Sequence, residues 1–282
     1  MSTGLAPAPE HARTAFRAPS SRRTLRLLVR RGLRDNRRAP LTWGGGLGAM
    51  TALMAAIWPS IEDSTAELVE SYPTGLKEAF GIQQLDTIEK YIDAEMLSLI
   101  MPLALAFFAV RCATRATVGA EDRGHLDTLL SLPVSRRVLV ASSFVVTGLA
   151  LVAILAVVWS LTWVAGTLAG GGISGTTLAA GLLNVWPLSM VFAGLAVLAA
   201  GVSHRPAVVT AVGAGTLVAM YVVDLVGRLA DPVEPLRVVS AFRYYGSAVQ
   251  DGLEAGHMLG LTIVALALAA IGARLFERRD VL

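Results

Sequence analysis

Six long apolar stretches are the feature that most restricts what this chain can fold into. They cover roughly residues 41–58, 96–118, 138–169, 177–202, 207–227 and 257–276. About 20 apolar residues in an α-helix cross the ~30 Å hydrocarbon layer of a membrane. Apolar and polar positions do not alternate along these stretches, which excludes the strands of a membrane barrel. The sequence therefore predicts an all-α membrane protein with six transmembrane helices, the third long enough to tilt or to extend beyond the membrane.

The composition agrees with a membrane class. Of the 282 residues, 54% are hydrophobic and 16% are charged, whereas a typical soluble domain has roughly 25% charged residues. This excludes a cytosolic enzyme, a secreted disulfide scaffold and a disordered regulator. The single cysteine, Cys112, allows no internal disulfide, and no grouping of Cys and His has the spacing of a zinc site. We expect neither a catalytic constellation nor a metal site.

Arginine is distributed unevenly between the segments that flank the stretches. Residues 1–40 hold ten arginines and two acidic residues, whereas residues 59–95 hold nine acidic residues and two lysines. Residues 111–137 and the C-terminal tail are again rich in arginine. By the positive-inside rule both termini are cytoplasmic, and residues 59–95 form an acidic extracytoplasmic loop. A cleaved signal peptide is a poor alternative, because a charged leader of forty residues is too long.

The basic N-terminal segment divides in two. Residues 1–20 are rich in Ala, Pro, Arg and Ser and are expected to be a disordered cytoplasmic tail. Residues 21–40 place Leu25 and Leu28 on one helical face and Arg30 and Arg34 on another. This pattern predicts an amphipathic basic helix lying along the inner leaflet, although the arginines could also serve only to set the topology. No aromatic residues interleave the arginines, so nucleic acid is not an expected partner.

The cytoplasmic loop at residues 119–137 carries a motif. Its sequence is Glu121-Asp122-Arg123-Gly124-His125-Leu126-Asp127-Thr128-Leu129-Leu130-Ser131-Leu132-Pro133-Val134-Ser135-Arg136-Arg137. Leu126, Leu129 and Leu130 share one helical face, Asp122 can cap the helix start, and Pro133 ends it. A cluster of leucines surrounded by charged side chains suits insertion into a groove on a partner protein. The alternative is an ordinary loop helix whose leucines rest in the headgroup layer.

This loop resembles the one between the first membrane pairs of type-2 ATP-binding-cassette (ABC) permeases. The short tail around Phe276-Glu277-Arg278-Arg279-Asp280-Val281 is also similar, as are the basic N-terminal helix and the six spans. The resemblance covers nearly the whole chain. It implies that the loop is a coupling helix that takes up the motion of a cytoplasmic ATPase. The residues to which it assigns this role are Glu121, Asp122, Arg123, Gly124, Leu126, Asp127, Leu129, Leu130 and Pro133.

The function implied by the resemblance is that of the permease subunit of an ATP-driven exporter in a bacterial plasma membrane. It implies a second permease copy or paralogue, two ATPase subunits, and an amphiphilic small-molecule or lipid-like substrate. The chain itself has no Walker A motif, because neither Lys77 nor Lys90 stands in a Gly-Lys-Ser/Thr sequence. We therefore expect no bound cofactor and no enzyme activity in this chain, with ATP and Mg held by the partner ATPase.

A few polar residues interrupt the apolar stretches and are candidates for a translocation path. Asp224 is the sharpest, although Arg228 follows at i+4 in a favourable orientation for an ion pair. Asn184 and Pro187 interrupt the fourth stretch, where Pro187 could kink the helix. Arg111 and Arg115, four residues apart, are expected to extend to the headgroups, to line an inner vestibule or to contact the basic N-terminal helix.

Two other functions remain open at this stage. A secondary transporter would use Asp224 as a proton carrier, and a non-transporting anchor or assembly factor would use the loop for binding alone. Small residues four apart predict close helix contacts within the bundle or between subunits. These pairs are Gly44 and Gly48, Gly166 and Gly170, and Gly256 and Gly260.

Overall fold

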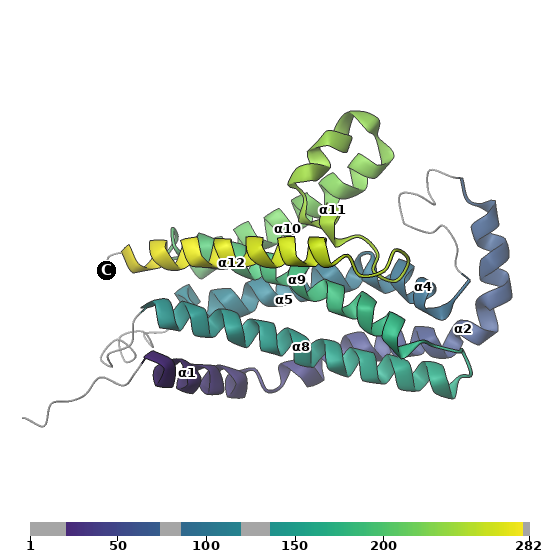
Figure 1. Ribbon diagram of the computed structural model, residues 1–282, viewed down its shortest axis with the longest axis horizontal. Coiled ribbons are helices and arrows are strands. Elements are labelled where there is room, and N and C mark those ends of the chain that lie inside the picture. The colour runs from purple at the N-terminus through teal and green to yellow at the C-terminus, as the bar shows by residue number, and fades with distance from the viewer. Residues whose placement is uncertain (1–20, 74–85, 120–135, 279–282) are drawn as a thin grey trace, which may run out of the picture.

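The computed structural model describes residues 21–73, 86–119 and 136–278, and these residues form helices with no strand among them (Figure 1). The α-helices are α1 (Ser21–Asp35), α2 (Gly45–Ser71), α4 (Ile88–Ile92), α5 (Ile100–Ala116), α8 (Arg136–Leu168), α9 (Gly175–Ala200), α10 (Pro206–Leu229), α11 (Ala241–Tyr245) and α12 (Ala255–Arg278). Two short π-helical segments are η2 (Pro40–Gly44) and η3 (Asp93–Leu97), and a 3-10 helix is η4 (Asp231–Val239).

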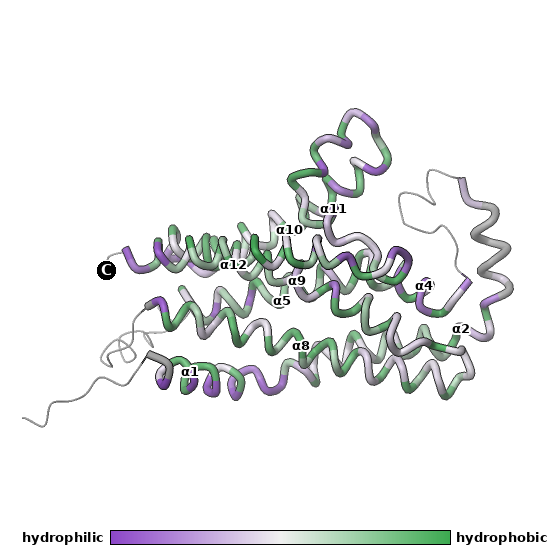
Figure 2. Tube along the Cα trace, viewed as in Figure 1, coloured by the Kyte–Doolittle hydropathy of each residue, from purple (hydrophilic) through white to green (hydrophobic). Residues whose placement is uncertain are grey.

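Five helical segments are long and apolar enough to cross a membrane. They are Pro40–Glu62, Arg137–Leu168, Gly175–Ala200, Pro206–Leu229 and Ala255–Arg278. A sixth is present if Ile88–Leu97 and Ile100–Ala116, which meet at an angle of 47°, form one broken span. Hydrophilic residues gather along α1 and at the helix ends, while the long helices are mainly hydrophobic (Figure 2). The fold is thus the predicted all-α, multi-pass type, with five to six candidate spans.

The long helices run back and forth along one axis, with α9 as the most buried of them. The most extensive packing joins α9 to α12, α2 to α8 and α5 to α9, while α1 lies along the start of α8. The bundle therefore has two ends. We call the end where α5 finishes and α8 starts the α1 end, and the opposite end the α11 end.

Close helix crossings depend on glycine at particular positions. A Cβ atom on Gly48 of α2 would lie 3.2 Å from the Cα of Val158 in α8, and one on Gly44 would lie 3.1 Å from the carbonyl oxygen of Ile154. The predicted contact at Gly44 and Gly48 is therefore present. Gly256, in contrast, has open space around it.

The other two predicted glycine pairs do not join helices within the described chain. Gly260 also faces open space, Gly170 adopts a φ of +77° in a turn, and Gly166 meets Ile173 of the following loop. The tightest crossing instead involves Gly272 of α12, where a Cβ would lie only 2.6 Å from a backbone nitrogen of α9. Sequence spacing alone missed it because Gly272 has no small residue four positions away.

Two boundaries differ from the apolar stretches. The first stretch ends at residue 58, but α2 continues through Pro59 as far as Ser71. α1 ends at Asp35, and a turn and η2 then lead directly into α2. Pro59 lies inside α2, where its ring removes one backbone hydrogen-bond donor from the helix. The acidic residues that follow Pro59 therefore begin in a helix that is continuous with the first candidate span.

Candidate functional site

Asp224 forms a double ion pair at the α11 end. It lies in the last turns of α10, where it is 3% exposed. Arg228 donates to its Oδ2 from Nε at 2.9 Å and from Nη2 at 2.7 Å, and Arg237 donates to Oδ1 from Nε at 3.0 Å. The first pair follows from the i, i+4 spacing, as predicted, whereas the second requires η4 to fold back on α10. Gly227 permits this, because a Cβ there would lie 2.4 Å from the Arg237 side chain.

A second buried carboxylate, Asp93, lies near this ion pair. Its Oδ2 accepts hydrogen bonds from the Ser247 hydroxyl at 2.5 Å and from the Gln250 amide at 3.2 Å. A cavity of about 70 Å³ has both Asp93 and Asp224 in its wall. In the part of the chain that the structure describes, the partners of Asp93 are neutral groups, while those of Asp224 are cations.

Sequence reasoning did not single out Asp93, which it counted only among the acidic residues of the outer loop. A signal was present, since Ile88, Ile92 and Met96 recur at intervals of four around it. That spacing indicates a helix with one buried face. All three side chains are fully buried in the structure, and Asp93 is buried beside them. A carboxylate next to such a face must find its hydrogen bonds within the protein.

Asn184 takes part in the packing of the same end. Its Nδ2 donates to the backbone oxygen of Tyr245, whose hydroxyl donates to the backbone oxygen of Leu97 at 3.0 Å. Asn184 thereby connects α9 to α11, and Tyr245 connects α11 to η3. Pro187 is buried one turn farther along α9, and the helix continues through it from Gly175 to Ala200. The structure thus brings Asn184 and Asp224 to one end of the bundle, where each makes structural hydrogen bonds.

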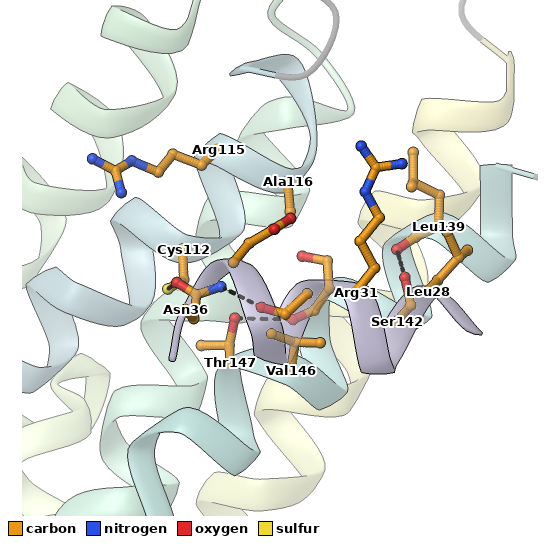
Figure 3. A pocket seen from close by; sticks show the side chains of 13 residues that line it. Leu28, Arg31, Asn36, Cys112, Arg115, Ala116, Leu139, Ser142, Val146 and Thr147 are labelled. Carbon is orange, nitrogen blue, oxygen red and sulfur yellow. Dashed lines mark hydrogen bonds between the residues drawn. The ribbon is translucent and has the colours of Figure 1, made fainter. Parts of the chain in front are cut away.

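A cleft of about 300 Å³ opens at the α1 end between α1, α5 and α8 (Figure 3). Its lining residues are Leu28, Arg31, Gly32, Asp35, Asn36, Cys112, Arg115, Ala116, Leu139, Ser142, Ser143, Val146 and Thr147. Asn36 closes one side, because its Nδ2 donates to Gly32 and its Oδ1 accepts from the Cys112 thiol at 3.6 Å. We call this space the α1 cleft.

Two further clefts flank the outward face of α5. Phe107, Arg111 and Arg115 follow one another at intervals of four on this face, and both arginines are exposed. On one side, a cleft of about 320 Å³ lies between the two arginines and the end of α1 and η2. On the other side a cleft of about 560 Å³ separates them from α10. The Arg111 guanidinium lies over the Phe107 ring, 6.0 Å from its centre.

The residues predicted for a membrane-interface helix lie on α1. Leu25 and Leu28 are half-buried, and Arg30 and Arg34 are exposed. Leu27 is also 60% exposed, so apolar side chains do not all turn toward the bundle. The helix rests on α8 through only part of its apolar face.

The predicted coupling residues, Glu121 to Pro133, lie outside the described residues. The elements on either side of them are described: α5 ends at Ala116 and α8 begins at Arg136, both at the α1 end. Arg137 at the start of α8 pairs with Glu277 near the end of α12 at 2.5 Å. The segment that contains the motif therefore connects two helices of the bundle beside the α1 cleft.

Helices of membrane length, exposed arginines at one end and clefts that open along α5 define a multi-pass membrane protein with the general plan of a transport subunit. A family model described as "Multidrug efflux system permease Rv1217c, C-terminal domain" matches residues 32–277, and the chain belongs to this family. The match agrees with the resemblance to type-2 ABC permeases. No curated protein matches the chain. The family makes it a membrane permease of an exporter rather than a catalytic subunit.

Proposed function

We propose that this chain is the membrane-spanning half of an ATP-driven exporter, and that it works with a second permease and with separate ATPase subunits. The observation that carries the proposal is the match of the multidrug efflux permease family to residues 32–277, which include every long helix of the bundle. The chain would form half of the translocation path, while ATP and Mg would be bound by the ATPase.

The proposed orientation places the α1 end in the cytoplasm of a bacterial cell. Basic residues gather at that end, on α1, at the end of α5 and at the start of α8. The acidic residues Glu89 and Asp93 lie at the α11 end. This asymmetry follows the positive-inside rule. The loop with the coupling motif would then face the cytoplasmic ATPase.

The outward face of α5 is the surface we propose for pairing with the second permease. It stands between η2 and α10, and α10 is among the least buried of the long helices. A second permease across this face would enclose Arg111 and Arg115 in a shared vestibule. Their charges would attract the polar part of an amphiphilic substrate, while Phe107 and the small residues of α10 would contact its apolar part.

Energy transfer is assigned to the loop between α5 and α8. Leu126, Leu129 and Leu130 would enter a groove on the ATPase, and Asp122, Arg123 and Asp127 would surround the contact with charge, as would Glu121 beside them. Gly124 and Pro133 would delimit the helix. Closure of the ATPase around ATP would move this helix and, through the start of α8, the rest of the bundle.

The test is an affinity purification of the permease from detergent-solubilised membranes, with ATPase activity measured on each eluate. We expect an ATPase to accompany the wild type and to be lost from a Leu129→Asp, Leu130→Asp variant. The control is Leu236→Asp, which makes the same kind of substitution once, on an exposed leucine of η4 at the opposite end. That variant should keep the ATPase.

Two results would contradict the proposal. One is a folded wild-type permease that carries no ATPase. The other is export from vesicles that needs no ATP, collapses with a protonophore and is abolished by Asp224→Asn, which would indicate a proton-driven transporter. The two arginines that hold Asp224 argue against that role, because both of its carboxylate oxygens are already engaged in ion pairs within the chain.

A further inference from the structure

A groove of about 620 Å³ lies at the α11 end, where α9, α10, η4, α11 and α12 all contribute to its lining. The lining includes Phe192 of α9, which is fully buried, and Val239 of η4 and Val264 of α12, which are 74% and 48% exposed. The groove therefore reaches from the surface of the bundle to its most buried long helix. We call it the α12 groove. We infer that it holds one acyl chain of a phospholipid from the leaflet on the α11 side of the membrane, an inference that depends neither on ATP coupling nor on export.

The α12 groove has the length of a lipid chain in one leaflet. Its lining runs along α12 from Gly256, in the first turn of the helix, to Leu268. These residues are 12 positions apart, which at ~1.5 Å per residue corresponds to about 18 Å along the helix. One leaflet contributes about half of the ~30 Å hydrocarbon layer, roughly 15 Å. A chain whose headgroup lies beside the start of α12 would therefore end near Leu268.

Glycine keeps the α12 groove open beside the start of α12. Gly256 and Gly260 both line it, and a Cβ atom at either position would meet open space. Small residues four apart often bring two membrane helices together, but no helix of the described chain occupies the space beside this pair. An empty groove would leave its lining atoms without packing partners on one side. A flexible hydrocarbon chain can fill such a space.

The polar side chains of the lining favour hydrocarbon over a polar ligand. The hydroxyl groups of Ser240 and Tyr244 already donate to backbone oxygens of α10 and η4, at 2.7 Å and 3.2 Å. His257 lies in the first turn of α12, where its Nδ1 is 2.6 Å from a carboxylate oxygen of Glu254 and its ring packs against that of Tyr244. Polar groups of a ligand would lose water in the groove without gaining these partners. The headgroup would therefore stay at the His257 end, and only its chain would enter.

A bound chain would support the segment between α10 and α12. Val238 and Val239 of η4 and Ala241 of α11 line the α12 groove together with residues of α9 and α12. The chain would thus contact both the bundle and the two short elements that pack on it. Because the pairing face proposed above lies on α5, a second permease there would leave the groove accessible to lipid.

The test is photocross-linking of the full-length chain in vesicles of phosphatidylethanolamine and phosphatidylglycerol. The probe is a phosphatidylglycerol whose palmitoyl chain carries a diazirine at its methyl end, and peptide mass spectrometry locates the adducts. We expect adducts on Val264 and Leu268 to exceed several-fold those on Leu266, which lies at a similar depth and is 53% exposed but does not line the groove. A probe with the diazirine beside the ester should instead label residues near His257.

Gly260→Leu distinguishes a chain in the α12 groove from bulk lipid. Its side chain would enter the space of the bound chain, so labelling of Val264 and Leu268 should fall to the level of Leu266 in a protein that still melts cooperatively. Ala267→Leu adds the same side chain on an exposed position outside the lining and should label as the wild type does.

Three results would overturn the inference. Equal labelling of Val264, Leu268 and Leu266 in the wild type would mean that bulk lipid alone contacts this helix. Unchanged labelling in Gly260→Leu would place the chain elsewhere. Labelling of Leu266 without any labelling of the groove would mean that a protein segment, such as a helix of a second copy, covers it.

Discussion

Asp224 shows how a charge is accommodated near the end of a membrane helix. Its side chain is almost fully buried, and three N–H groups from Arg228 and Arg237 satisfy both carboxylate oxygens. The arginine side chains are themselves 31% and 21% exposed, so the positive charges keep contact with the outside. The carboxylate is thus compensated more completely than a single surface ion pair would allow.

We predict that Asp224→Asn destabilises the protein by about 2–4 kcal/mol, because two arginines then face each other without a carboxylate between them. The melting temperature in detergent should fall by roughly 5–10 °C. Asp231→Asn, which removes a carboxylate from an exposed position in η4, should leave it unchanged. A proton-carrier role would give the opposite pattern, with normal stability and lost transport.

The sequence allowed the pairing of Asp224 with Arg228 to be predicted, but not the pairing with Arg237. The first depends on local helical spacing alone, whereas the second depends on the path of the chain after α10. The same distinction explains Asp93, whose partners Ser247 and Gln250 come from a distant loop. Contacts between elements far apart in sequence require the packed structure.

At the scale of elements, the bundle depends on how closely α12 approaches α9. A Cβ at Gly272 would meet three backbone atoms of α9 at 2.6–2.7 Å, and one at Gly194 would lie 2.6 Å from a backbone oxygen of α12. Backbone atoms cannot rotate away as a side chain can. The two helices therefore touch along their backbones at these positions, and α9 is enclosed as the most buried long helix.

Gly272→Ala should consequently force α12 away from α9. We expect a loss of about 1–3 kcal/mol in the free energy of unfolding, which is typical of overpacking. Gly260→Ala lies in the same helix with open space around it and should be neutral or slightly stabilising, because alanine favours the helix. Thermal unfolding of both variants in one detergent provides the comparison, and equal stability would contradict the close crossing.

The sequence located most of the long elements within a few residues, because runs of apolar residues directly reflect helices of membrane length. It did not show the 47° bend between η3 and α5 or the extension of α2 to Ser71. Both features lie where polar and apolar residues mix, so hydropathy gives no sharp boundary. Asp93 lies in the segment before the bend and is buried. The apolar stretch that predicts the second span begins only at residue 96 and so does not include it.

At the scale of the whole molecule, exposed apolar residues are spread over α2, α8, α10 and α12. Lipid alone can cover such faces, so apolar exposure does not identify a protein partner. The outward face of α5 differs, because it presents Arg111 and Arg115 between two clefts. Pairing of that face with another permease would enclose the two arginines in a water-filled vestibule, so that their charges would not face lipid.

Self-pairing through this face predicts a specific cross-link. In a chain with Cys112→Ala, a cysteine at Val218, one turn from the α10 residues that line the cleft beside α5, should give a covalent dimer with a bifunctional maleimide in native membranes. A cysteine at Ile263 of α12 is equally exposed and should give monomer. Dimer formation through Ile263 alone would move the pairing face to α12.

The length of α8 has a mechanical consequence. Its 33 residues make a continuous rod about 50 Å long, well beyond the ~30 Å of hydrocarbon. Pivoting at its middle by about 10° would carry each tip through about 4 Å. Its starting tip is fastened to α12 through Arg137 and Glu277. A displacement of the start of α8 would therefore move the other end of this rigid helix in the opposite direction, on the far side of the membrane.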